Sequence, residues 1–294
     1  MSSYWGADIG GTSTKLGRID GREFEMVAVL PTPADSPPRA LLQRLTEEIL
    51  DYDSHPEGLG VGVAGLVEIE RGLLLTSPNM PAWVNVPVRE TLRSLLSCPI
   101  VVHNDANTFA YGAVARKEIP SEGVWLLITL GTGIGGTIVH DGRIIFGKGF
   151  AGEFGHMSVK AHGLPCPCGS KGCWERYASK DAIISYYREI SGTDDQPDPR
   201  EIADRARRGE QPAIEAFDRL GYWIGVGLAN LGWCFSPHGF VLAGGLAPNL
   251  DLFESSCRET YRQRCPLDLD ISRLKLASDA GALGAALLVR DEDQ

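Results

Sequence analysis

One short stretch of the sequence concentrates side chains that bind metal ions. His156 is followed by Cys166, Cys168 and Cys173, so that three of the seven cysteines lie within eight residues. Three thiolates and one imidazole complete a tetrahedral zinc shell and leave no position open for a reacting water. We therefore predict that these four residues hold a structural zinc ion.

The same cysteines could instead be small buried apolar side chains, as cysteines in intracellular proteins often are. Their spacing, Cys-x-Cys-x4-Cys, also differs from the commoner Cys-x2-Cys knuckle. The clustering favours zinc, because the remaining cysteines are scattered along the chain: Cys98, Cys234, Cys257 and Cys265. A metal ion here would fix Glu153 and Glu175, which bracket the cluster, on an otherwise mobile loop.

Two glycine-rich loops, Asp8–Lys15 and Gly131–Thr137, each follow one strand-like apolar segment and precede another. Their similarity indicates a duplicated building block. Glycines allow a backbone to approach a ligand closely, and the N–H groups there, with the hydroxyls of Thr12 and Thr132, can bind phosphate oxygens. Either loop alone could be an ordinary tight hairpin. The occurrence of two such loops favours phosphate binding.

The second loop also matches the Gly-x-Gly-x-x-Gly pattern of dinucleotide-binding proteins. That fingerprint requires a helix directly after the glycines. Here Gly136 is followed by Thr-Ile-Val-His-Asp-Gly-Arg-Ile-Ile-Phe, in which two apolar runs surround an Asp-Gly turn. The pattern predicts a hairpin, which excludes the dinucleotide-binding fold.

A carboxylate that could act as a general base lies between the two loops. A short β-branched run ends in Asn104 and Asp105, and a helical pattern follows from Ala106 to about Lys117. Open α/β sheets place ligand chemistry at the carboxyl ends of their strands. In phosphoryl transfer, Asp105 could accept the proton of an attacking hydroxyl. Its alternative role is to cap the helix that follows, unless Asn107 does so.

Further polar groups suit a sugar. Gly65 ends a buried strand-like run, and Asn79 lies in a loop bracketed by prolines. An amide, several carboxylates and a histidine are the groups that hydrogen-bond the hydroxyls of a carbohydrate. Asn79 could equally satisfy its own turn.

The elements that position these groups are those of a two-domain α/β protein. A chain of 294 residues exceeds what one core usually serves. The net charge of −10 argues against nucleic-acid binding through a broad electrostatic surface. The longest apolar run, Val124–Leu130, is too short to span a membrane. An odd cysteine count without a recognisable signal peptide predicts a reducing, cytoplasmic location.

With these residues in view, the chain resembles the ROK family (repressors, uncharacterised reading frames and sugar kinases), most closely its bacterial glucokinases. The resemblance extends over essentially the full length and is most specific in the cysteine-rich motif with Glu-x-Gly-His. The matching segments are Asp8–Thr12, Pro78–Asn79, Asn104–Asn107, Leu130–Gly136, Glu153–His156, Cys166–Glu175 and Ala243–Gly245.

The resemblance implies an actin/hexokinase-like, ribonuclease H-like fold: two α/β domains with the active site in the cleft between them. We expect the N-terminal domain to comprise residues 1–117 with 279–294, because the last helix, Ala280–Arg290, should pack back on it. Residues 118–278 would form the C-terminal domain, with helices at Trp174–Ile190 and Ile214–Phe235.

The resemblance also implies roles for single residues. Asp105 would deprotonate the sugar hydroxyl that attacks the γ-phosphate of MgATP, and His156 would bind zinc through one ring nitrogen and the sugar through the other. The residues expected to bind the hexose are Gly65, Asn79, Asn104, Asp105, Glu153, His156 and Glu175. Those expected to bind the nucleotide are Asp8, Gly10, Gly11, Thr12, Thr132, Gly133, Gly244 and Gly245.

Two positions depart from the family pattern. The usual Gly-x-Pro-Gly turn reads Gly62-Val-Ala64-Gly65, and without the rigid proline we expect a looser sugar loop. In the first glycine loop, Lys15 follows Thr12 at a greater distance than in many members, so we assign it no phosphate contact.

The activity that the resemblance implies is ATP-dependent phosphorylation of a hexose at its 6-hydroxyl, with glucose preferred and Mg²⁺ and structural Zn²⁺ as cofactors. A kinase of N-acetylmannosamine or N-acetylglucosamine is the alternative within the family. A sugar-responsive transcriptional repressor is the alternative of another class. It would need a DNA-binding helix-turn-helix before the first glycine loop, and only seven residues precede Asp8, so we do not expect it. We expect a homodimer or higher homo-oligomer without nucleic-acid or membrane partners.

Overall fold

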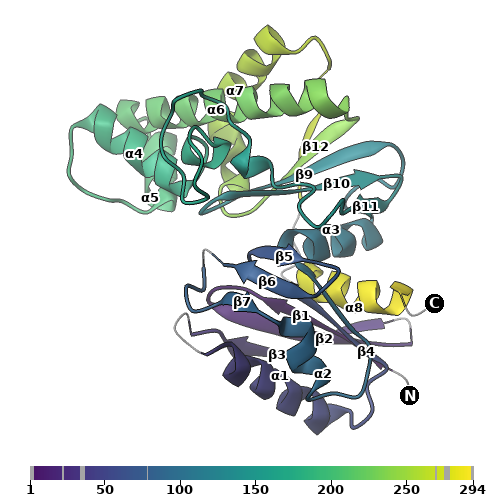
Figure 1. Cartoon of the computed structure of the whole chain (residues 1–294). Coiled ribbons are helices and arrows are strands. Elements are labelled where there is room, and N and C mark those ends of the chain that lie inside the picture. The colour runs from purple at the N-terminus through teal and green to yellow at the C-terminus, as the bar shows by residue number, and fades with distance from the viewer. Residues whose placement is uncertain are drawn as a thin grey trace. The chain divides into compact units, whose positions relative to one another are not determined.

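The computed structural model describes residues 3–21, 23–33, 37–77, 79–268, 270–274 and 279–292. The chain divides into two compact units (Figure 1). The first comprises Met1–Ser121, Gly142–Ala151 and Lys275–Gln294, and the second Glu122–Asp141 and Gly152–Leu274. Among the described residues, no helix has the length and apolarity needed to cross a membrane.

The units lie close to the expected domains, apart from shifts of four residues at two boundaries (118–121 and 275–278) and one larger difference. We expected Gly142–Ala151 in the C-terminal domain, whereas this segment clusters with the first unit. Two contacts explain its position. Phe146 packs on the ring of His103 with the centroids 4.5 Å apart, and a Cβ built on Gly149 would lie 2.8 Å from the carbonyl oxygen of Val67.

The first unit is built on a five-stranded sheet of order β3-β2-β1-β4-β8. Its strands β1, β2 and β3 form an antiparallel meander, while β1, β4 and β8 run parallel. The strands are β1 (Ser3–Ile9), β2 (Ser13–Asp20), β3 (Glu23–Pro31), β4 (Gly58–Val63) and β8 (Ile100–Asn104). A three-stranded sheet accompanies it: β5 (Leu66–Glu68), β6 (Leu73–Thr76) and β7 (Val84–Val86).

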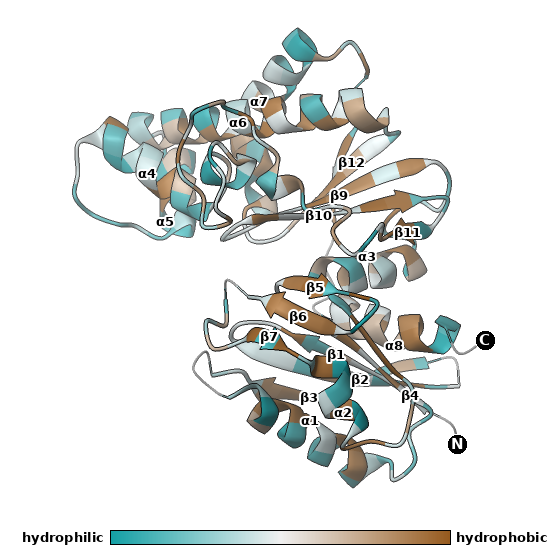
Figure 2. Cartoon of the chain, in the orientation of Figure 1, coloured by the Kyte–Doolittle hydropathy of each residue, from teal (hydrophilic) through white to brown (hydrophobic). Residues whose placement is uncertain are grey.

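Helices cover both faces of the first sheet (Figure 1). They are α1 (Pro38–Tyr52), α2 (Val88–Arg93), α3 (Asp105–Ala115) and α8 (Ala280–Glu292). Side chains alternate along β1, so that Trp5 and Ile9 join the apolar cluster under α1, while Gly6 faces α8. Figure 2 shows apolar residues, in brown, along β5 and β6 of this unit.

Helix α8 packs closely against both the sheet and α3. A Cβ built on Gly60 would lie 1.8 Å from the carbonyl oxygen of Ala285, and one on Gly284 would lie 1.7 Å from that of Thr108. No side chain can occupy either position without moving the helix. The expectation that the last helix packs back on the N-terminal domain is therefore confirmed.

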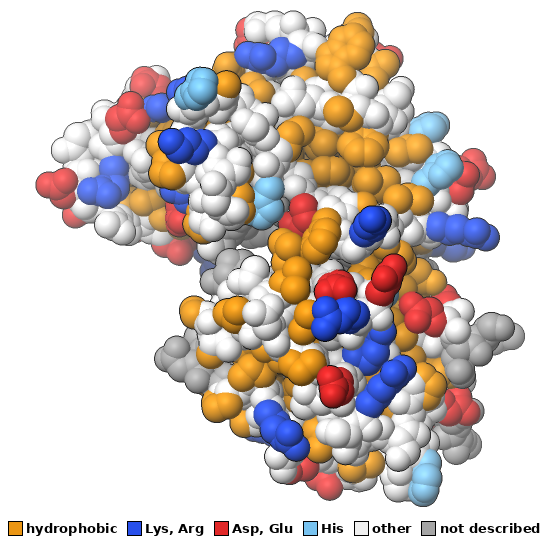
Figure 3. Space-filling model, viewed as in Figure 1, with side chains coloured by type: hydrophobic (Ala, Val, Ile, Leu, Met, Phe, Trp, Pro, Cys, Tyr) orange, Lys and Arg blue, Asp and Glu red, His pale blue; other side chains and the backbone are white. Residues whose placement is uncertain are grey.

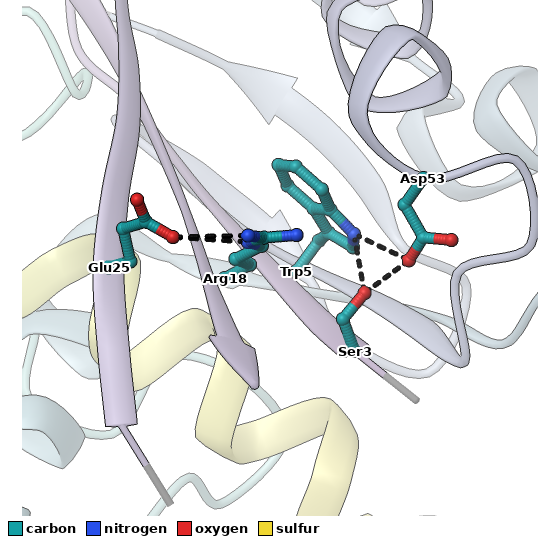
Figure 4. Close-up of polar contacts among 5 residues, drawn as sticks. All are labelled: Ser3, Trp5, Arg18, Glu25 and Asp53. Carbon is teal, nitrogen blue, oxygen red and sulfur yellow. Dashed lines mark hydrogen bonds and ion pairs between the residues drawn. The ribbon is translucent and has the colours of Figure 1, made fainter. Parts of the chain in front are cut away.

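A buried polar contact fixes the end of α1 to β1 (Figure 4). The Trp5 indole donates to Ser3 Oγ at 3.0 Å and to Asp53 Oδ2 at 3.4 Å, and the Ser3 hydroxyl also donates to Asp53. Asp53 follows the last turn of α1, so this network joins the helix to the first strand. Arg18 pairs with Glu25 across β2 and β3 at 3.2 Å.

The second unit repeats the plan of the first. Its sheet has the order β11-β10-β9-β12-β13, with β9 antiparallel to β10 and parallel to β12. The strands that lie within the second unit are β9 (Val124–Leu130), β10 (Ile134–His140), β12 (Gly239–Ala243) and β13 (Ile271–Arg273). The edge strand β11 (Arg143–Ile145) belongs to the segment that clusters with the first unit. The shared strand order confirms the predicted duplication of a building block.

The helices of the second unit include one difference from the sequence prediction. They are α4 (Lys180–Ser191), α5 (Pro199–Arg207), α6 (Gln211–Phe235) and α7 (Leu250–Arg264). The helix expected from Trp174 begins only at Lys180, because the Ser179 hydroxyl caps α4 by accepting from Ala182 N at 3.4 Å. Residues Trp174–Arg176 form a separate short 3₁₀ turn.

Candidate active site and metal cluster

The predicted catalytic and phosphate-binding residues of the first unit meet at one edge of its sheet. Strand register pairs Ile9 with Val63 and Val63 with Asn104, so β1, β4 and β8 end level with one another. The residues directly after these strands are Gly10, Ala64 and Asp105. Parallel strands thus bring a glycine loop and a carboxylate to the same place.

The first glycine loop is a tight connection between antiparallel strands. Gly10 N donates to Ser13 O at 3.1 Å, and Thr12 O accepts from Thr32 N at 2.9 Å. The Thr12 side chain is exposed, so its hydroxyl is accessible to a ligand. Gly11 lies against Asn79, since a Cβ built there would be 2.6 Å from Asn79 Cβ. Pro78, beside Asn79, lies outside the described residues.

Asp8, one residue before the end of β1, is the acidic group of this loop. It faces Lys15 across the β1–β2 pair, with 3.8 Å between Lys15 Nζ and Asp8 Oδ2. Helix α8 closes the other side, because a Cβ built on Gly281 would lie 2.7 Å from the Asp8 carboxyl carbon. Burial raises the pKa of Asp8 above its ordinary value, and the charge of Lys15 opposes that rise. The lysine therefore helps to keep the carboxylate ionised.

Asn104 caps helix α3, and this decides one alternative left open by the sequence. Its Oδ1 accepts from Ala106 N at 2.8 Å, while its Nδ2 donates to Gly65 O at 2.7 Å. Asp105 is the first helical residue, and its Oδ1 also accepts from Ala106 N, at 3.0 Å. Asn107, the other possible cap, is buried inside the helix. Asp105 is thus not the principal cap of α3.

A backbone hydrogen bond and close contacts hold the turn after β4. Ala64, which stands where the family pattern has proline, donates its N–H to Ile9 O at 3.0 Å. A proline could not make this bond. Gly65 has φ 136° and its absent Cβ would lie 2.3 Å from Thr76 O, so only glycine suits this position. A hydrogen bond therefore holds the turn where the family pattern has a rigid ring, and the looser loop stays a prediction.

The second glycine loop, in the other unit, has the same form. Gly131 N donates to Gly133 O at 2.9 Å, and the Thr132 side chain is exposed, as Thr12 is in the first loop. The Gly244 turn packs directly behind it, because a Cβ built on Gly244 would lie 2.5 Å from Leu130 O. The structure therefore brings together the nucleotide-binding residues predicted for this unit.

The predicted zinc ligands also come together. Single ligand atoms of His156, Cys166, Cys168 and Cys173 all lie within 4.8 Å of one another. Cys168 Sγ is 3.6 Å from Cys173 Sγ, and Cys166 Sγ is 3.9 Å from His156 Nδ1. Sulfur atoms on a tetrahedral zinc ion are about 3.8 Å apart, given a bond of about 2.3 Å. The donor set and its spacing fit zinc.

Two carboxylates border this cluster within the second unit. Glu175 Oε1 accepts from Cys166 Sγ at 3.1 Å and lies 3.7 Å from His156 Nδ1. Glu175 also reaches the second glycine loop, because a Cβ built on Gly133 would lie 2.7 Å from its Oε2. Burial raises the pKa of Glu153, with His156 opposing the rise and Glu175 adding to it. The cysteine cluster, the glycine loop and the acidic side chains thus form one site.

A two-unit α/β chain with the same strand order and a glycine hairpin in each unit defines the actin/hexokinase-like class of proteins. Within that class the chain belongs to the ROK family, whose sequence model matches residues 4–292. The family and fold predicted from the sequence are confirmed.

Individual relatives agree with this assignment. The chain is 32% identical to a glucokinase from Streptomyces coelicolor over 98% of each sequence. It is 31% identical to an N-acetyl-D-glucosamine kinase from Vibrio cholerae over 97% of this chain and 99% of that one. Among solved structures, a ROK family glucokinase from Streptomyces griseus in complex with glucose and AMPPNP is 30% identical, with a TM-score of 0.80 over 99% of this chain and all of the other.

Proposed function

We propose that this protein is an ATP-dependent hexose kinase that phosphorylates glucose at its 6-hydroxyl to give glucose 6-phosphate. The family and the glucokinase relatives support the reaction class. Within the chain, the observation that carries the proposal is the level ending of β1, β4 and β8. It brings the Asp105 carboxylate and the first glycine loop to one sheet edge.

In the proposed reaction, Asp105 accepts the proton of the sugar 6-hydroxyl, and the oxygen attacks the γ-phosphorus of ATP. The bond between the γ-phosphorus and the bridging oxygen breaks, and ADP leaves. The residues proposed to bind a hexose are Gly65, Asn79 and Asn104 in the first unit and Glu153, His156 and Glu175 in the second. The glycine loops bind phosphate oxygens through backbone N–H groups and the hydroxyls of Thr12 and Thr132.

The two metal ions have different roles in this proposal. Mg²⁺ neutralises the charge of the phosphates when bound, and the Asp8 carboxylate is an oxygen donor of the kind that it prefers. Zinc would be held by Cys166, Cys168, Cys173 and His156, and with these four ligands it would serve structure rather than hydrolysis. It fixes the loop that carries Glu153, His156 and Glu175.

A second candidate function is the phosphorylation of an N-acetylhexosamine. The similarity to the Vibrio cholerae N-acetyl-D-glucosamine kinase favours it, and the groups expected to bind the hexose would serve both sugars. The two candidates differ in substrate, not in mechanism.

A coupled assay with MgATP and four sugars tests the proposal. We expect glucose to give the highest kcat/KM, above mannose, N-acetylglucosamine and N-acetylmannosamine. A higher value for either N-acetylated sugar would replace glucose by that substrate. The absence of turnover with all four would refute the hexose-kinase assignment. The cytoplasmic location and the homo-oligomeric state remain predictions, the second open to light scattering.

A further inference from the structure

One cation of the second unit has a position that the sequence did not single out. Lys180 is the first residue of α4 and lies between the second glycine loop and the Gly244–Gly245 turn. We infer that Lys180 binds a phosphate group of the donor nucleotide, one that is not transferred. The inference rests on the proposed function, because the family resemblance alone places nucleotide beside these glycines.

The backbone fixes Lys180 to the glycine loop. Its N–H donates to Gly131 O at 2.8 Å, and the neighbouring Ser179 caps α4. Ser179 is buried, so the start of the helix is anchored in the interior. The first residue of α4 therefore cannot move independently of the loop that bears Thr132.

The side chain extends over the second glycine turn. A Cβ built on Gly245 would lie 3.1 Å from Lys180 Cε and 3.4 Å from its Nζ. Gly245 itself is exposed, so the ammonium group lies beside a backbone surface that a ligand can reach. A larger residue at 245 would compete with the lysine for this space.

The charge of Lys180 is not explained by the folded chain itself. Among the residues that the structure describes, no carboxylate forms an ion pair with it. A cation at a helix N-terminus is also mildly unfavourable, because the macrodipole is positive there. Its neighbour Asp181 is exposed and offsets this only in part. A bound anion would satisfy both the ammonium group and the glycine backbone.

The chemistry of an ammonium group beside a phosphate predicts which kinetic constant of the Lys180 variant changes. An ammonium group is a compact point charge with three donors and a common phosphate ligand. We assign the contact to the α-phosphate, which does not carry the leaving oxygen, so that the contact is about equally strong before and during transfer. Such uniform binding lowers KM for ATP without raising kcat. A residue needed only for folding would not show this separation.

The test compares Lys180→Ala with Lys180→Arg and with Arg208→Ala in the full chain. Arg208 is an exposed cation at the end of α5 in the same unit, outside the proposed site. For Lys180→Ala we expect the Kd for AMPPNP, measured by calorimetry, to rise about tenfold, equivalent to about 1.4 kcal/mol. KM for ATP should rise to a similar extent, with kcat and the Kd for glucose within twofold of wild type. Lys180→Arg should keep most of the affinity, and Arg208→Ala all of it.

Two outcomes would overturn the inference. One is an unchanged AMPPNP affinity in Lys180→Ala, with the protein folded by circular dichroism. The other is an equal loss of glucose and AMPPNP affinity, which would indicate general damage. Failure of the proposed function appears differently: the wild-type protein would bind AMPPNP, with or without the Lys180 effect, and phosphorylate none of the four hexoses.

Discussion

Replacing Asp105 by asparagine separates the catalytic role of this residue from a capping role. The variant keeps the side-chain oxygen that accepts from Ala106 N at 3.0 Å, and Asn104, the principal cap, is untouched. The substitution removes one negative charge from the first turn of α3, where it interacts favourably with the helix dipole. That loss is about 0.5 kcal/mol. Stability should therefore change little.

Catalysis should respond quite differently. An amide cannot accept the proton of the attacking hydroxyl, and removal of a general base lowers kcat by about 10² to 10⁴-fold. The Kd for glucose should stay within about threefold, since a neutral amide still forms hydrogen bonds to a hydroxyl. Stopped-time assays with MgATP give kcat, calorimetry gives the glucose Kd, and urea denaturation gives the free energy of unfolding.

Asn104→Ala is the matched control, because it acts on the cap and leaves the carboxylate. Loss of the Asn104 side chain removes the hydrogen bond from Ala106 N, which is worth about 1 kcal/mol for an N-cap. It also removes the bond to Gly65 O, worth about 1 kcal/mol more. We expect a destabilisation near 2 kcal/mol and weaker glucose binding. If Asp105→Asn keeps kcat within tenfold of wild type, the general-base assignment is refuted. A loss of stability as large as that of Asn104→Ala would show that Asp105 also caps the helix.

Three further predictions concern the metal, the helix contact and the first glycine loop. We expect elemental analysis to find about one zinc ion per chain in the wild type and little in Cys168→Ser. This variant should lose more than about 4 kcal/mol in the free energy of unfolding, as expected on loss of a structural metal, and should bind glucose more weakly. Active protein without zinc would contradict this prediction. Gly284→Ala should lower the free energy of unfolding by about 3 kcal/mol in denaturation experiments, because the added methyl group overpacks against Thr108. A decrease below about 1 kcal/mol would mean that α8 and α3 separate easily. Lys15→Met should raise the pKa of Asp8 further, because the charge that opposes the effect of burial is lost. As the pH falls, the ionised form of Asp8 is then lost at a higher pH than in the wild type. The acid limb of the pH profile of kcat/KM for MgATP should therefore shift to higher pH. An unshifted acid limb would contradict a role of Asp8 in nucleotide binding.

The sequence was most informative where chemistry depends on neighbours along the chain. The cysteine cluster and the two glycine hairpins are local patterns, and each folds as its spacing predicts. The duplication could be predicted because both hairpins follow apolar strands. The sequence did not predict their common sheet order, in which the first strand of each meander lies in the centre.

Contacts between distant segments could not be derived in this way. Nothing in Gly142–Ala151 indicates that Phe146 packs on His103. Similarly, the glycines at 60 and 284 appear ordinary until α8 is placed on the sheet and on α3. At Ala64, loss of the family proline suggested flexibility, and the sequence did not indicate that its N–H bonds to Ile9 O. Lys180 belongs to no sequence motif, because it contacts two glycine turns that are distant from each other in sequence.

The Asn104 side chain links the proposed base to the proposed sugar loop. Its two amide atoms bond to Ala106 N, at the start of α3, and to Gly65 O, after β4. Any displacement of the Gly65 turn by a sugar would pull on the cap of the helix that begins with Asp105. Aspartate at 104 could still accept from Ala106 N, but it has no N–H to donate to Gly65 O. The amide is therefore the side chain at this position that can both cap the helix and fix the turn, which explains why Asn104 precedes the carboxylate rather than a second acid.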